Sequence, residues 1–118
     1  MINVTVLQLL QIGPALQSLA TQPHKGRVAF RIRKLIMAVQ PKLAAASAAR
    51  DTLFTEENSI PAGNGARQLK PECVTEVLND PLFRDMVSLD ADLLSMADLE
   101  DALISVEHID ALAPLMEP

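Results

Sequence analysis

The feature that most constrains the fold is a long stretch of helical periodicity in the first half of the chain. Apolar residues recur there at steps of three and four positions: Val28, Ile32, Leu35, Val39, Leu43, Ala46 and Leu53. This spacing places them on one face of a helix and predicts one amphipathic helix from about Gly26 to Thr55. At 1.5 Å per residue the helix is roughly 45 Å long, and Pro41 is expected to kink it.

The size and composition of the chain favour one domain around that helix. The chain has 118 residues, of which 49% are apolar and 21% are charged. A chain of this length has no room for two hydrophobic cores, so we expect residues 1–118 to form a single helical domain. Its one cysteine, Cys73, excludes an internal disulfide. No signal peptide or membrane-spanning segment is expected, because the apolar start is interrupted at Gly13 and has no basic region before it.

Charge is strongly segregated along the sequence. Residues 1–50 carry seven basic residues and no acid, whereas residues 71–118 carry twelve acids and only one basic residue. The chain therefore divides into a basic helical part (1–55), a middle segment (56–70) and an acidic part (71–118). Opposite poles of this kind attract, so they pair either within one chain or between subunits.

The N-terminal part is expected to form a short, broken helix. Thr5 and Gln8 have the spacing of a capping box, which starts a helix near Val6. Proline removes a helical donor and restricts the residue before it, so the Gly13-Pro14 step predicts an interruption. We expect one piece to end at about Gln11 and a second to run from Pro14 to about Thr21.

The remainder is expected to be a loop followed by short helices. Residues 56–70 are rich in Asn, Gly and Pro, which predicts an exposed loop. Helices are expected at Glu72–Leu78, after the N-cap Asp80 and after the N-cap Ser105. Residues 88–94 alternate between apolar and polar, which allows a short extended segment. The expected fold class is all-α.

The sequence offers no constellation that supports catalysis, a metal site or a cofactor. It contains no G-x-S-x-G, phosphate-binding loop, H-E-x-x-H or C-x-x-C motif. His24 and His108 stand apart on what we interpret as surface, and Cys73 is interpreted as a small, partly buried residue beside acids. We therefore expect a protein that is not an enzyme, with no catalytic, cofactor-binding or metal-binding residues.

The candidate functional residues are charged and are expected to bind a partner. They lie in a basic stripe on the long helix and in the acidic part of the chain: Arg27, Arg31, Arg33, Lys34, Glu100, Asp101, Glu107 and Asp110. Nucleic acid is an alternative ligand for the basic stripe. The absence of Trp, Tyr and any base-reading motif weighs against it.

The order of these signals resembles a family of small proteins of tailed bacteriophages and prophages. The matching segments are Val4 to Leu10, Pro14-Ala15-Leu16, Lys25-x-x-Val28-Ala29-Phe30-Arg31-Ile32 and Ala48-Ala49-Arg50-Asp51-x-Leu53. The C-terminal Leu99, Ser105, Ile109, Leu112 and Leu115 fit the closing pattern of that family.

This resemblance implies a non-catalytic phage protein, found in the virion or in the host cytoplasm. The leading hypothesis is a structural or assembly component that forms a homo-oligomer and contacts other virion proteins. The alternative is an inhibitor that covers a host protein with its acidic half. The two hypotheses differ in whether the protein is present in purified particles.

Overall fold

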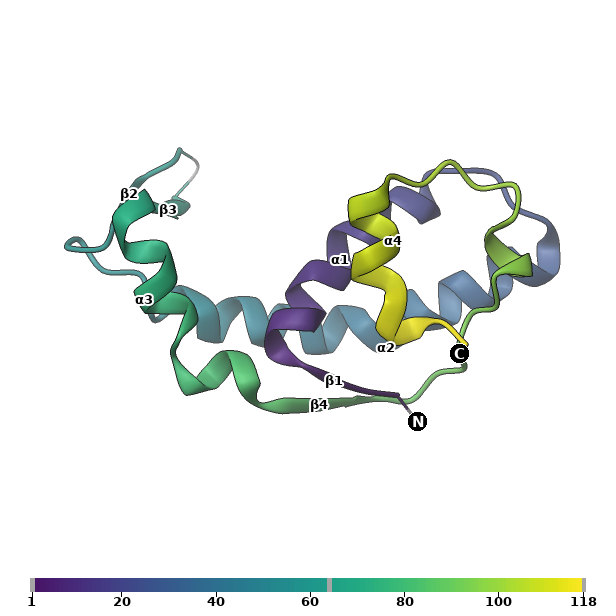
Figure 1. The fold of residues 1–118 in the computed structure, drawn as a ribbon, viewed down its shortest axis with the longest axis horizontal. Coiled ribbons are helices and arrows are strands. Elements are labelled where there is room, and N and C mark those ends of the chain that lie inside the picture. Colours follow the sequence, from purple (N-terminus) through teal and green to yellow (C-terminus); the bar gives the residue numbers. More distant parts are fainter. Residues whose placement is uncertain (1, 64, 118) are drawn as a thin grey trace.

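The computed structural model describes residues 2–63 and 65–117. The chain forms an elongated body of 47 × 27 × 23 Å whose long axis follows the longest helix, α2 (Gly26–Asp51) (Figure 1). The other helices are α1 (Val6–Ala20), α3 (Val74–Leu78) and α4 (Val106–Leu112). Four short strands are present: β1 (Ile2–Thr5), β2 (Ser59–Pro61), β3 (Arg67–Leu69) and β4 (Met86–Leu89). Single 3₁₀ turns cover Pro71–Cys73, Pro81–Arg84, Ala97–Leu99 and Ala113–Leu115.

The strands make this a mixed α/β protein, so the all-α prediction was wrong. β1 pairs with β4 in antiparallel register, with Ile2 opposite Leu89 and Val4 opposite Val87. Ile2, Val4 and Leu89 point into the core, and Asn3 points out. A strand of four residues shows only two apolar alternations, which is too short a pattern to distinguish it from the start of a helix. The extended segment expected at 88–94 was only partly correct, because the strand runs from Met86 to Leu89 and does not include residues 90–94.

The first helix begins where the capping box predicts but is not broken. The Thr5 hydroxyl accepts a hydrogen bond from the Gln8 amide at 3.1 Å, and the Gln8 side chain accepts one from the Thr5 amide at 2.9 Å. α1 then continues through Pro14. Proline disfavours a helical residue before it partly through a clash with that residue's Cβ, and Gly13 has no Cβ. The predicted break is therefore absent.

The long helix was predicted correctly except for its last turn. α2 starts at Gly26 and buries Ile32, Leu35, Val39 and Ala46 on one face. It ends at Asp51 rather than Thr55, because the next amides bond three residues back instead of four. The Thr52 amide donates to Ala49, and the Leu53 amide donates to Arg50. Pro41 lies inside the continuous helix.

The segment expected to be a loop contains a β-hairpin. β2 and β3 pair antiparallel, with Ser59 opposite Leu69, in a stretch otherwise rich in turn residues. Gly63 and Gly65 adopt positive φ angles of 88° and 75°, a conformation that other residues rarely adopt, and so the chain can reverse. The buried Ser59 accepts a hydrogen bond from Arg67 Nε at 2.7 Å, which holds the two strands together.

The predicted caps in the acidic part are confirmed, but the helix expected after Asp80 is only the 3₁₀ turn Pro81–Arg84, because the chain is extended from Met86 and pairs with β1. The Asp80 carboxylate accepts a hydrogen bond from the Leu82 amide at 2.9 Å, and the Ser105 hydroxyl accepts one from the His108 amide at 3.2 Å. α4 begins directly after Ser105.

Leu94, which is fully buried, connects this part to the C-terminal segment, because its amide donates to the Leu115 carbonyl at 2.8 Å.

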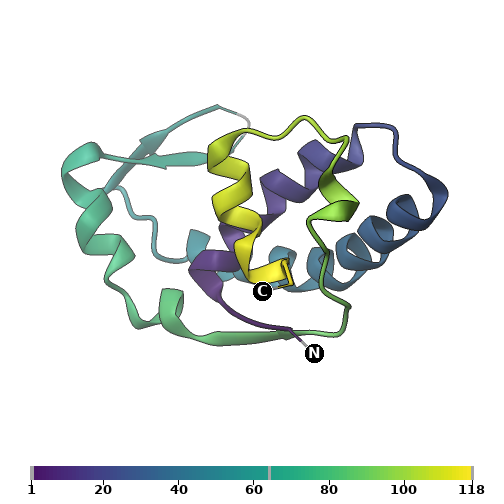
Figure 2. The same ribbon diagram turned by 45° about the vertical axis from the view of Figure 1, so that its right-hand side comes forward.

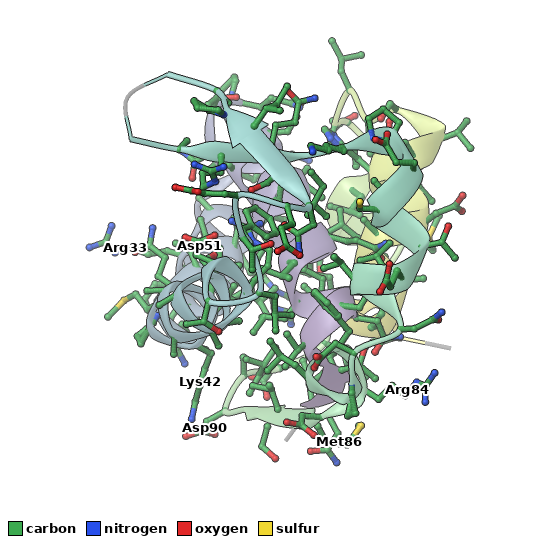
Figure 3. The ribbon with its side chains drawn as sticks, turned by 90° about the vertical axis from the view of Figure 1, so that its left-hand side faces the viewer. Arg33, Lys42, Asp51, Arg84, Met86 and Asp90 are labelled. Atoms are coloured by element: carbon green, nitrogen blue, oxygen red, sulfur yellow. The ribbon has the colours of Figure 1, made fainter. Side chains whose placement is uncertain are left out.

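The three main helices are arranged as layers. α1 contacts α2 on one side and α4 on the other (Figures 1 and 2). Viewed along the long axis, α2 and α4 lie on opposite sides of α1 (Figure 3). The buried apolar side chains form one cluster between these layers and the β1–β4 ribbon. The sides of α2 and α4 that are turned away from α1 therefore point in opposite directions.

Candidate functional site

Within residues 2–63 and 65–117, the basic and acidic parts of the chain meet directly at one ion pair. Arg31 on α2 donates from Nη1 to the Asp98 carboxylate at 3.0 Å, across 67 positions of sequence. The same carboxylate accepts a hydrogen bond from the Ser95 amide at 2.9 Å, and the Ser95 hydroxyl accepts one from the Asp98 amide. The Asp98 side chain is 9% exposed and that of Arg31 is 34% exposed. This pair fastens the acidic segment to α2.

The environment of Asp98 favours its charged form. The hydrogen bond from the Ser95 backbone lowers the pKa of the Asp98 carboxyl most, and the Arg31 guanidinium lowers it further, against the opposing effect of burial. Both partners stabilise the carboxylate over the neutral acid. Asp98 therefore stays ionised to a lower pH than an ordinary aspartate does.

Of the other basic candidates, Arg27, Arg33 and Lys34 are exposed on α2. Figure 3 shows Arg33 directed away from the layers beneath it. Lys34 places its Nζ 5.1 Å from the centroid of the Phe30 ring, a cation–π contact. Among residues 2–63 and 65–117 the ion pairs are Arg31–Asp98 and Arg50–Asp51, so these three cations have no carboxylate partner in that part of the chain.

The acidic candidates occupy two places. Glu100 and Asp101 line an open groove whose opposite wall includes His24 and Lys25, next to the turn between α1 and α2. Glu107 and Asp110 are exposed on α4 and line a second groove against α1. All four are exposed. None of the eight candidates is ion-paired with another of the eight.

The carboxylate that does pair, Asp98, was not among the sequence candidates. Its signal was the Ser95-x-x-Asp98 spacing, which marks a side chain held by a local cap and therefore a fixed charge. The acidic candidates were instead residues that cluster in the sequence, and clustered acids usually lie on the solvent-exposed face of a helix.

A second feature of the surface that the charge pattern did not predict is a group of exposed apolar side chains. Phe30 is 61% exposed and Met37 is 63% exposed, and both lie on the face of α2 opposite the buried Leu35 and Val39. We call Phe30 and Met37, with Arg27, Arg33 and Lys34 beside them, the outer face of α2. The available signal was that Phe30 and Met37 fall outside the three- and four-residue rhythm of the core positions.

A comparable face lies on the other side of the molecule. Leu103, Val106 and Ile109 are 85%, 77% and 46% exposed. They follow one another at three-residue steps, at the start of α4 and just before it. We call these three residues, with Glu107 and Asp110, the outer face of α4. Large apolar side chains grouped on a surface mark interaction sites more often than scattered single ones do.

A further groove separates α2 from the segment after β4. Lys34, Met37 and Lys42 lie on the α2 side, and Asp90 and Asp92 on the other. Figure 3 shows Lys42 directed toward Asp90. The opposite charges of the two chain halves thus face each other across this groove, and Lys34 and Met37 form the edge of the outer face of α2 beside it.

The remaining candidates for chemistry are placed apart. His24 bonds through Nε2 to the Leu19 carbonyl at 2.8 Å, at the end of α1. Cys73 is half-buried and is not in a disulfide. Within the described ranges, no three His, Cys, Asp or Glu side chains gather as ligands for a metal ion. In the same part of the chain, every helix is too short or too polar to cross a bilayer.

Comparison with protein-family models, with curated proteins and with solved structures gives no match to this chain. The resemblance to a phage protein family therefore stays a prediction from the sequence.

Proposed function

We propose that this protein acts by binding another protein through the outer face of α2, and not by catalysis. The observation that carries the proposal is the exposure of Phe30 and Met37, two turns apart on the same side of a 26-residue helix. When a partner covers exposed apolar surface, the complex is stabilised by about 25 cal/mol for each Å² removed from water. Both side chains stand on a helix backbone that is already ordered, so binding costs little backbone entropy.

The shape of this face favours a protein ligand. Sites for small molecules are concave, whereas this one is the convex surface of a helix. An apolar centre of two side chains with charged residues beside it resembles the core and rim of a protein interface. The charged residues on α2 at this rim are all positive, and Asp90 and Asp92 lie only across the groove beside Met37, so a partner with an acidic rim is complementary to the α2 side.

The resemblance noted in the sequence makes the proposal more specific. It supports a structural or assembly component of a tailed bacteriophage, which binds other virion proteins or copies of itself. Under this proposal the protein is found in particles or their precursors.

A photoreactive amino acid at position 37 tests the binding function. In cells that naturally produce the protein, irradiation is expected to yield a crosslinked protein adduct. The same group at the exposed Glu56, beyond the end of α2, is expected to yield far less. If position 37 gives no more adduct than position 56, the outer face of α2 is not a binding site and the proposal fails.

Retention on DNA tests the nucleic-acid alternative. Binding at about 50 mM salt that R33E and K34E abolish would replace protein with nucleic acid as the ligand of this face. No retention is expected, because the chain has no Trp or Tyr to stack on bases.

A further inference from the structure

The outer face of α4 has the features that the outer face of α2 requires in a partner. Leu103, Val106 and Ile109 supply exposed apolar surface, and Glu107 and Asp110 supply negative charge beside it. No Lys or Arg occurs between residues 85 and 118. The face is therefore acidic around an apolar centre, where the outer face of α2 is basic around one.

The apolar side chains of this acidic face stand on a fixed backbone. The Gln22 side chain donates to the Leu103 carbonyl at 2.8 Å and accepts from the Leu103 amide at 2.9 Å. Ser105 caps the next turn through the His108 amide. Leu103 is thus held in place by two hydrogen bonds while its side chain is 85% exposed. A flexible loop would let a leucine turn toward the core, but this anchored segment presents it to solvent.

The geometry prevents one chain from joining its own two faces. α1 lies between α2 and α4, and the faces look outward from opposite sides of this three-layer arrangement (Figure 3). Complementary faces on opposite sides of one molecule can meet only between copies.

Charge also argues against a symmetric contact of α2 with α2. Such a contact would bring Arg27, Arg33 and Lys34 of one copy against a helix of the same charge, and Arg31 is already paired with Asp98. Like charges brought together at an interface cost free energy. The complementary acidic face of α4 carries no such penalty.

We infer that the partner of the outer face of α2 is the outer face of α4 on a second copy of this chain. This inference rests on the proposed binding function of α2 and names its partner. Phe30 and Met37 pack against Leu103, Val106 and Ile109, while Arg33 and Lys34 oppose Glu107 and Asp110. The contact is heterologous, so repeating it builds a ring or a filament of copies.

Complementary charge reversal tests the inference. The variant R33E/K34E reverses the α2 face, and the variant E107K/D110K reverses the α4 face. Each variant alone is expected to self-associate at least about tenfold more weakly than the parent chain in sedimentation at low salt. An equimolar mixture of the two is expected to associate again, because each reversed face then meets a complementary one.

Matched controls separate this effect from net charge. Double reversals of exposed residues outside the two faces, Arg84 with Lys25 and Glu56 with Glu57, reverse two charges as the face variants do and are expected to leave association unchanged. If the mixture of the two face variants stays as dissociated as its components, the pairing of α2 with α4 is wrong. Circular dichroism of each variant confirms that it is folded.

Disulfide trapping gives the geometry independently. In a background with Cys73→Ser, a Met37→Cys chain and a Val106→Cys chain are oxidised separately and together. The inference predicts a dimer bond in the mixture and little in either chain alone. A dimer from Met37→Cys alone would show a symmetric α2 contact and overturn the inference.

The photocrosslinking experiment distinguishes the two proposals. An adduct of twice the chain mass of 12.8 kDa supports both of them. An adduct only with a different protein keeps the binding function and overturns self-association. No adduct overturns both.

Discussion

Arg31 on α2 and Asp98 in the acidic segment are joined at 3.0 Å, and this pair is the direct ionic link between the basic and acidic halves of the chain in residues 2–63 and 65–117. The Asp98 carboxylate also accepts a hydrogen bond from the Ser95 amide, so its position is fixed independently of Arg31. Arg31 therefore serves the fold, whereas its neighbours Arg33 and Lys34 remain exposed.

Reversing Arg31 is expected to lower stability, and reversing Arg33 is not. Arg31→Glu places a second negative charge beside Asp98 and removes the hydrogen bond, at a cost of about 1–2 kcal/mol of unfolding free energy. Arg33→Glu, on the exposed side of the same helix, is expected to change it by less than about 0.5 kcal/mol. Urea unfolding at neutral pH and matched ionic strength measures both. Equal losses in the two variants would contradict the structural role of Arg31.

The stability contributed by Asp98 is expected to depend on pH in the acid range. Its pKa is lowered in the folded chain from the ordinary value of 3.8, so folding favours the carboxylate. The stabilisation is full above the unfolded value and is lost as the pH falls through the folded one. The stability difference between the parent chain and Asp98→Asn should therefore be constant above about pH 5 and shrink below 3.8. A difference that grows on acidification would contradict this assignment.

The packing of α1 against the Leu43 side chain of α2 is expected to be sensitive to a side chain at Gly13. A Cβ added at Gly13 would lie 2.6 Å from Leu43 Cδ2, and a side chain there also crowds Pro14. Gly13→Val is therefore expected to cost about 1–3 kcal/mol of unfolding free energy. Gly26→Ala at the start of α2, where an added Cβ meets nothing within 4 Å, is the matched control and is expected to be neutral or slightly stabilising. Calorimetry compares the two, and equal effects would show that this packing tolerates a side chain.

These residues also show how far sequence could predict the structure. The long helix and the caps at Thr5, Asp80 and Ser105 were predictable, because periodicity and capping act within a few residues. The pairing of β1 with β4 was not, since it joins residues more than 80 positions apart through two apolar contacts per strand. The continuity of α1 through Pro14 was also missed, because the sequence analysis applied the usual restriction before proline to Gly13, which has no Cβ to cause that clash.

The candidate site was predictable in its charge but not in its geometry. Segregated charge identified a basic helix and an acidic half, and Arg33, Lys34, Glu107 and Asp110 are indeed exposed. Which of the charges pair within the chain depends on tertiary distances, and so Asp98 was missed. The exposure of Phe30 and Met37 was missed although both fall outside the spacing of the core positions on α2, and that of Leu103 was missed because it is decided by tertiary packing.

The β2–β3 hairpin is expected to depend on Arg67. Arg67 donates from Nε to the Ser59 hydroxyl at 2.7 Å and from Nη2 to the Ser59 carbonyl at 3.0 Å. Arg67→Met leaves both buried acceptors without this donor and is expected to open the hairpin locally. Limited proteolysis should then cleave between residues 59 and 69 faster, while the thermal transition of the core moves little. Gln68→Met, on the exposed side of the same strand, is the control. Unchanged cleavage in Arg67→Met would show that strand pairing alone holds the hairpin.

The anchoring of Leu103 is expected to depend on Gln22. Gln22→Ala removes both hydrogen bonds to the Leu103 backbone, so hydrogen exchange of that amide should accelerate by about tenfold, which corresponds to roughly 1.4 kcal/mol of local opening. Gln22→Glu keeps an acceptor for the amide but loses the donor to the carbonyl, and its exchange rate should lie between the two. Gln17→Ala, on an exposed position of α1, should leave the rate unchanged. Because the outer face of α4 requires a fixed Leu103, self-association should weaken in the same order as exchange accelerates. Association that is unaffected in Gln22→Ala while the amide exchanges freely would show that Leu103 is not part of the contact.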